Sequence, residues 1–82
     1  MEVKDRVIVV TGAGRGIGAA MCRAIAEAGC KAVVVSDRDE SAADDVATEI
    51  GPQAVANRCD VAIEADVQQL VASTIAQFGK NI

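Results

Sequence analysis

The stretch VIVVTGAGRGIG, residues 7–18, joins an apolar run to a glycine-rich segment. The run contains only Val and Ile before Thr11 and does not alternate, which is typical of a strand covered on both faces. The glycines that follow permit a tight turn, a close approach of the backbone to a phosphate, and close packing of a helix on the strand. The free N–H groups at the start of that helix would face an anion. The stretch therefore predicts a strand, a phosphate-binding turn and a helix.

The composition limits what can surround this turn. The 82 residues make one small domain, 1–82, and 51% hydrophobic with 24% charged residues indicates a globular chain. The net charge is -4 and Phe78 is the sole aromatic residue. The chain lacks a basic cluster that could neutralise phosphates and the aromatic residues that could stack on bases, so nucleic-acid binding is disfavoured.

The three cysteines, Cys22, Cys30 and Cys59, are widely spaced, and the chain has no histidine. This pattern does not predict a zinc site, and we expect reduced, buried thiols. The N-terminus is charged, and no apolar stretch approaches the roughly 20 residues needed to span a bilayer. The sequence therefore predicts no membrane segment and favours a cytoplasmic location.

The rest of the chain alternates short apolar runs with segments of helical period, which indicates βαβ units around a parallel sheet. The expected strands are 7–11, 32–36 and 54–58, and the expected helices are 16–28, 41–50 and 63–78. Right-handed crossovers give the strand order 3-2-1, with the first two helices on one face and the third on the other. We expect an α/β, three-layer, Rossmann-type half unit, βαβαβα, whose first strand has one unpaired edge.

Helical spacing also predicts which side chains face the sheet. The stripes are Ile17, Ala20, Met21, Ala24, Ile25 and Ala28 in the first helix, Ala43, Val46, Ala47 and Ile50 in the second, and Val67, Leu70, Val71, Thr74, Ile75 and Phe78 in the third.

Asp37 follows the glycine motif by about 20 residues and comes just after the second expected strand. An acid at that place in a Rossmann unit accepts hydrogen bonds from the adenosine ribose hydroxyls. The alternative is a plain tight turn with a solvated acid before a helix.

These residues are similar to a known family. Thr11 to Gly18 resembles the T-G-x-x-x-G-I-G fingerprint of the short-chain dehydrogenases/reductases, and Asp37 matches their ribose-binding acid. Cys59-Asp60-Val61 resembles the Asp-Val pair that follows the third strand in this family. Phe78-Gly79-Lys80 resembles the segment that leads to the family's fourth strand. The resemblance covers essentially the whole chain and implies the N-terminal, cofactor-binding half of such an enzyme.

The resemblance also implies roles for particular residues. Gly12, Gly16 and Gly18 would form the dinucleotide turn, with the Ile17 backbone near the pyrophosphate. Asp37 would bind the ribose, Asp60 would meet the adenine amino group, and the Val61 backbone would touch the ring. Asp60 has the alternative of being a solvated acid before a helix.

Arg15 and Arg38 are ambiguous, because a basic residue in this family meets the 2'-phosphate of NADP yet also occurs beside an acid such as Asp37. The Asp37 carboxylate would repel that phosphate, so we expect NAD as the cofactor and NADP to be the weaker ligand.

The family's N-N-A-G segment, catalytic Ser and Y-x-x-x-K pair would lie beyond residue 82, and the chain contains no tyrosine. Lys80 is expected to be a surface charge. The sequence thus predicts a catalytically incomplete, NAD-binding half of an oxidoreductase, as a truncated product, a fragment or a part of a longer enzyme. Two alternatives are a nucleotide-binding module without turnover and an interaction protein whose exposed first strand and third helix dock onto a partner. We also expect the unpaired first strand to bind a second copy of the chain or the remainder of the enzyme.

Overall fold

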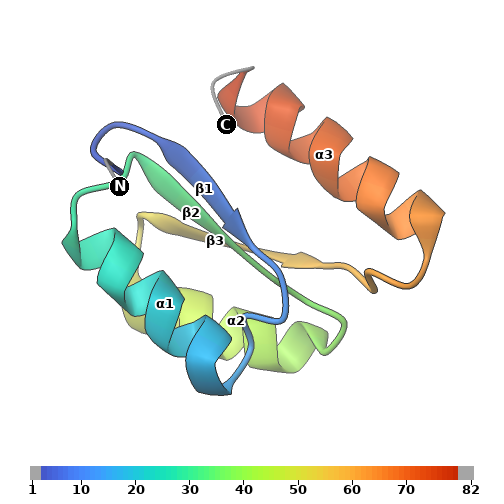
Figure 1. Cartoon of the computed structure of the whole chain (residues 1–82), viewed down its shortest axis with the longest axis horizontal. Coiled ribbons are helices and arrows are strands. Elements are labelled where there is room, and N and C mark those ends of the chain that lie inside the picture. The colour runs from blue at the N-terminus through green and yellow to red at the C-terminus, as the bar shows by residue number, and fades with distance from the viewer. Residues whose placement is uncertain (1–2, 80–82) are drawn as a thin grey trace.

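The computed structural model describes residues 3–79, so Lys80 lies outside the described residues. Strands and helices alternate along the chain (Figure 1). The elements are β1 (Val7–Val10), α1 (Gly16–Glu27), β2 (Ala32–Asp37), α2 (Glu40–Ile50), β3 (Ala54–Arg58) and α3 (Glu64–Phe78).

The three strands form one parallel sheet with β2 in the centre, in the order β1-β2-β3. Helices α1 and α2 cover one face, and α3 lies on the other (Figure 1). The predicted three-layer βαβαβα arrangement and strand order 3-2-1 are therefore confirmed. The carboxyl ends of all three strands lie at the same edge of the sheet, which is where a doubly wound fold binds its ligands.

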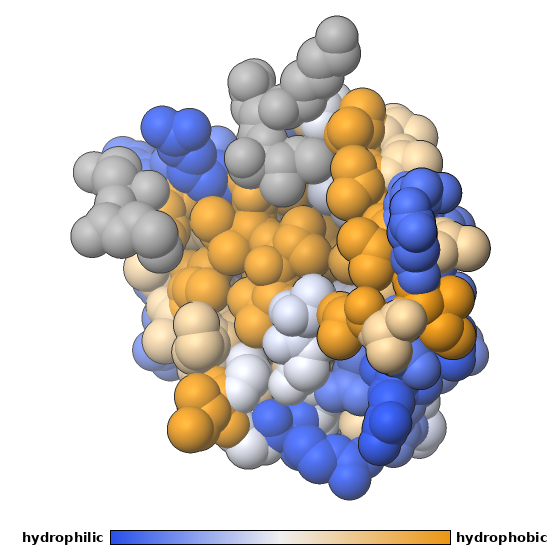
Figure 2. Space-filling view, turned by 45° about the vertical axis from the view of Figure 1, so that its right-hand side comes forward, coloured by the Kyte–Doolittle hydropathy of each residue, from blue (hydrophilic) through white to orange (hydrophobic). Residues whose placement is uncertain are grey.

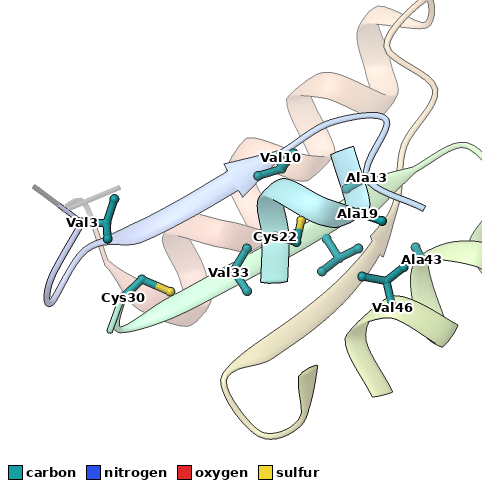
Figure 3. Close-up of a cluster of buried hydrophobic side chains, with 10 residues drawn as sticks. Val3, Val10, Ala13, Ala19, Cys22, Cys30, Val33, Ala43 and Val46 are labelled. Carbon is teal, nitrogen blue, oxygen red and sulfur yellow. The ribbon is translucent and has the colours of Figure 1, made fainter. Parts of the chain in front are cut away.

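The larger core lies between the sheet and the first two helices (Figure 3). Val33 and Val35 of β2 are fully buried there and meet small side chains of the two helices. These are Ala19 and Cys22 of α1 and Ala43 and Val46 of α2. Small side chains allow both helices to lie close to the sheet, and the inner face predicted for the second helix is confirmed.

A smaller core lies on the opposite face under α3. Val7 and Val34 pack there with Leu70 and Cys59. All three cysteines of the chain are free and buried, as predicted. Among residues 3–79 no helix is long and apolar enough to cross a membrane.

The stripe predicted for the first helix is wrong at most positions. Ile17 is 81% exposed and Met21 49% exposed, while Ala19 and Cys22 face the sheet. The rotation of the helix follows from Gly18, where an added Cβ would lie 2.3 Å from the carbonyl oxygen of Gly12. This contact turns positions 18, 19 and 22 inward and carries the larger apolar side chains outward.

The stripe predicted for the third helix is too wide. Leu70 and Thr74 are buried, but Val71 is 49% exposed and Ile75 39% exposed. The helix contacts the small core through a narrow line of side chains, so the neighbouring apolar positions face outward. Figure 2, which brings the α3 side of the molecule forward, shows hydrophobic residues gathered on this face.

The boundaries differ from the prediction by one residue at several ends. Strand β2 includes Asp37, because Asp37 pairs with Arg58 of β3 and its carbonyl accepts from the Cys59 N–H at 3.0 Å. Helix α2 begins at Glu40 because Asp39 caps it through the Ala42 N–H. Helix α3 begins at Glu64, after Ile63, which has no capping side chain.

Candidate functional site

The glycine turn after β1 needs glycine for two reasons. Gly12 and Gly16 have φ values of +64° and +61°, in the left-handed region that favours glycine. Gly18 touches the backbone of Gly12 so closely that no side chain fits between them. The three glycines thus play the conformational and packing parts that the sequence motif predicts.

Helix α1 begins without a capping side chain and without an acidic residue in its first turn. The N–H groups of Gly16, Ile17 and Gly18 have no acceptor among residues 3–79. Unpaired N–H groups at a helix N-terminus, together with the helix dipole, form a site for an anion such as phosphate.

Asp37, at the end of β2, is held by two backbone hydrogen bonds. Its Oδ1 accepts from the Asp39 N–H and its Oδ2 from the Gly14 N–H, each at 2.9 Å. These bonds, first that from Asp39 and then that from Gly14, hold the pKa of the Asp37 carboxyl below its usual value. The carboxylate therefore stays ionised, fixed in orientation, and retains further lone pairs for other donors.

Arg15 forms an ion pair although most of its side chain is exposed. Its Nη2 lies 2.6 Å from Oδ2 of Asp39, which itself caps α2 by accepting from the Ala42 N–H at 3.1 Å. Arg38, between the two acids in sequence, is exposed. The two ambiguous arginines are thus distinguished, since Arg15 is in an ion pair and Arg38 has no ion-pair partner among the described residues.

Asp60 and Val61 lie in the turn between β3 and α3. Oδ1 of Asp60 accepts from the Ala62 N–H at 2.9 Å, which closes the turn. Oδ2 of Asp66 accepts both from the Asp60 N–H at 3.1 Å and from Nη1 of Arg58 at 2.7 Å. Asp66 thus anchors the turn, and Val61 is 63% exposed at its tip.

These segments enclose one open cleft of about 700 Å³ at the carboxyl ends of the strands, here called the strand-end cleft. It is lined by Gly12, Arg15, Asp37, Arg38, Asp39, Cys59, Asp60, Val61 and Ala62. Most of the predicted site residues are therefore brought together, although they come from three separate loops. Gly16, Ile17 and Gly18 do not line the cleft and lie at the start of α1.

The cleft suits a dinucleotide in chemical terms. The glycine turn has open space where side chains would stand at Gly12 and Gly16, and it is followed by N–H groups that have no acceptor among residues 3–79. An oriented carboxylate, Asp37, lines the same cleft as Asp60. Within residues 3–79 no group of three or more His, Cys, Asp or Glu side chains could hold a metal ion.

Comparison with known proteins identifies the family of this chain. Residues 6–81 match the sequence profile of the short chain dehydrogenases. The chain belongs to the short chain dehydrogenase family. It is 47% identical over 75 residues to an L-fucose dehydrogenase of Bos taurus, and the matched region covers 92% of this chain and 27% of that protein.

Solved structures of other short chain dehydrogenases have the same fold. A 3-ketoacyl-(acyl-carrier-protein) reductase from Brucella melitensis, complexed with NADH, matches with a TM-score of 0.90 and 42% identity over 95% of this chain and 32% of that one. A family member from Burkholderia phymatum, in complex with NAD, matches with a TM-score of 0.90 and 34% identity over 98% of this chain and 29% of that one. This chain spans about a quarter to a third of the length of these relatives.

Sequence reasoning assigned no role to three residues that shape this candidate site: Gly14, Asp39 and Asp66. Asp39 carried a signal, because an Asp immediately before a helix is a preferred cap. No local sequence pattern indicates the bond between Asp39 and Arg15, because the two residues are 24 positions apart. Asp66 reads as an ordinary acid of a first helical turn, and its role depends on the path of the loop before it.

Proposed function

We propose that this chain binds NAD in the strand-end cleft and at the neighbouring start of α1, as the dinucleotide-binding part of a short chain dehydrogenase. The observation that carries the proposal is the Asp37 carboxylate, held ionised at the end of β2 by two backbone N–H groups and facing the same cleft as the glycine turn. Two relatives with this fold are complexed with NADH or NAD, which supports a nicotinamide dinucleotide.

The proposed contacts follow the chemistry of each segment. Gly12, Gly16 and Gly18 let the backbone approach the pyrophosphate, and the N–H of Ile17 donates to it. Asp37 accepts from the ribose hydroxyls. Oδ2 of Asp60, which has no hydrogen-bond partner among the described residues, accepts from the adenine amino group, and the Val61 backbone lies against the ring. Arg15 and Arg38 flank the ribose end.

NAD is proposed over NADP because of the charge on Asp37. The 2'-phosphate of NADP would bring a second negative charge against a carboxylate whose lowered pKa keeps it ionised at neutral pH. Two like charges in a partly desolvated cleft repel each other. Arg15 offsets this repulsion little, because its own charge is already paired with Asp39. Arg38 offsets it little because it is exposed, and exposed charge pairs contribute only about 0–1 kcal/mol.

Bound NAD supplies a hydride acceptor, and NADH a hydride donor. The residues of this chain bind and orient the dinucleotide and present no tyrosine or histidine for proton transfer. We propose hydride transfer between NAD(P) and an alcohol or ketone for the family reaction in which this half takes part, with no catalytic residue within this chain.

Calorimetric titration of the 82-residue chain with NAD and NADP tests the assignment. We expect the unsubstituted chain to bind NAD more tightly, and Asp37→Asn to weaken NAD binding and reduce the preference. Asp44→Asn, which removes the same charge from an exposed position of α2, is the matched control and should leave the preference unchanged. A preference for NADP in the unsubstituted chain, or an unchanged preference in Asp37→Asn, would contradict the role of Asp37.

A second role is favoured by the unpaired edge of β1. Within residues 3–79, β1 pairs only with β2, and apolar side chains of α3 are exposed on the same side of the molecule (Figure 2). We propose that this side receives a further strand or surface, from a second copy or from the remainder of a longer enzyme. The three buried free thiols favour a reducing, cytoplasmic compartment for the assembled protein.

A further inference from the structure

The ion pair between Arg15 and Asp39 lies in the strand-end cleft beside Asp37. We infer that Asp39 is a specificity-determining residue that excludes NADP by holding the Arg15 guanidinium. This inference rests on the proposed function, because it concerns which dinucleotide the same cleft selects. It assigns to Asp39 an effect exerted through Arg15, so Asp39 is a positioning residue.

The Asp39 carboxylate is fixed before any ligand arrives. Its Oδ1 accepts from the Ala42 N–H as the cap of α2, and its backbone N–H donates to Asp37. Only Oδ2 remains, and it meets Nη2 of Arg15 at 2.6 Å. A carboxylate held by a helix N-terminus loses little freedom on pairing, so this contact is better preorganised than a pair of two flexible side chains.

Arg15 is the cation of the glycine turn that could otherwise meet a 2'-phosphate. Its position in the cleft, near enough to Asp37 to favour the charged form of that acid, places its charge at the ribose end. To bind a phosphate it must leave Asp39, which would then lie close to the phosphate as a second unpaired negative charge. Asp39 therefore opposes NADP twice, by competing for Arg15 and by its own charge.

The test compares two variants at neighbouring positions, each of which removes one negative charge. Asp39→Asn keeps a good cap for α2 but removes the charge that holds Arg15. Glu40→Gln removes an equal charge one residue later, from an exposed side chain with no ion-pair partner among the described residues. Dissociation constants for NAD and NADP are measured by calorimetry, and thermal unfolding is recorded for each variant.

We expect Asp39→Asn to raise the affinity for NADP relative to NAD by about three- to fivefold, as the gain of one exposed charge pair allows. Glu40→Gln should change that ratio less than about twofold. The gain should disappear when Arg15→Ala is combined with Asp39→Asn, because the released guanidinium is its source. A purely structural role for Asp39 would lower both affinities together and leave their ratio unchanged.

Each other outcome overturns the inference in a recognisable way. An unchanged ratio in Asp39→Asn, an equal gain in Glu40→Gln, or a gain that survives Arg15→Ala shows that Asp39 does not act through Arg15. If the unsubstituted chain binds neither dinucleotide, the proposed function itself is wrong and the inference falls with it. Binding of NAD with no response to Asp39→Asn overturns the inference alone.

Discussion

The backbone N–H of Gly14 donates to Oδ2 of Asp37 across 2.9 Å, although the two residues are 23 positions apart. This bond joins the glycine turn directly to the end of β2. It is possible because Gly14 has no side chain, since an added Cβ would lie 2.9 Å from the same oxygen and 2.7 Å from Cβ of Ala42. The turn and the acid are thus one packed unit.

Gly14→Ala should therefore disturb both stability and the site. We expect the free energy of unfolding to fall by about 1–3 kcal/mol, the usual cost of overpacking, and NAD binding to weaken. Chemical denaturation and NAD titration measure the two effects. Gln69→Ala, at an exposed position of α3, should stay within about 0.5 kcal/mol of the unsubstituted chain. Unchanged stability in Gly14→Ala would show that the turn can move away from Asp37.

Asp37 should make stability depend on acid pH. Its pKa is lowered in the folded chain by the N–H groups of Asp39 and Gly14, so the folded state binds fewer protons than the unfolded state in acid. The resulting stabilisation is fully present above the ordinary value of 3.8 and is lost as the pH falls through the lowered folded value. Denaturation at a series of pH values from neutral to below 3.8 should show this loss.

The same pH series separates Asp37 from the other acids. Asp37→Asn should remove part of the pH dependence, whereas Asp44→Asn, at an exposed position without a hydrogen-bond partner among the described residues, should leave it in place. Identical profiles for the unsubstituted chain and Asp37→Asn would mean that the two backbone bonds do not stabilise the ionised form.

The strand order and the meeting of Gly12, Asp37 and Asp60 in one cleft could be predicted from sequence, because parallel βαβ units place every strand's carboxyl end at one edge. The rotation of α1 could not, because it depends on the contact of Gly18 with Gly12 rather than on which residues are apolar. Hydrophobic spacing predicted that Ile17 and Met21 face the sheet, but both side chains are exposed.

The side-chain pairings within the site could not be predicted from the sequence either. Asp39 and Asp66 are both acids at helix starts, and local pattern explains each by the helix dipole. Their partners, Arg15 and Arg58, are set by the paths of separate loops. Local rules identify which residues can hydrogen-bond, and the tertiary fold selects among them.

Asp66 should control the shape of the turn that carries Asp60. Asp66→Ala removes the acceptor of both the Asp60 N–H and the Arg58 guanidinium, so we expect NAD affinity to fall several-fold, the loss of about one hydrogen bond. Calorimetry measures the change. Glu64→Ala, which removes the other acid of the first turn of α3, should have little effect because Glu64 bonds only to Gln68 among the described residues. Equal losses in both variants would assign the effect to helix charge instead.

The unpaired side of β1 should make the chain associate with itself. An exposed strand edge offers unpaired N–H and C=O groups, and Val71 of α3 is an exposed apolar side chain. Light scattering should show a mass that rises with concentration, and Val71→Lys should reduce the rise because a buried ammonium is costly. Ala20→Lys, which adds the same charge on the exposed side of α1, should not. A monodisperse monomer at high micromolar concentration, or equal effects of the two lysines, would show that this side of β1 does not drive association.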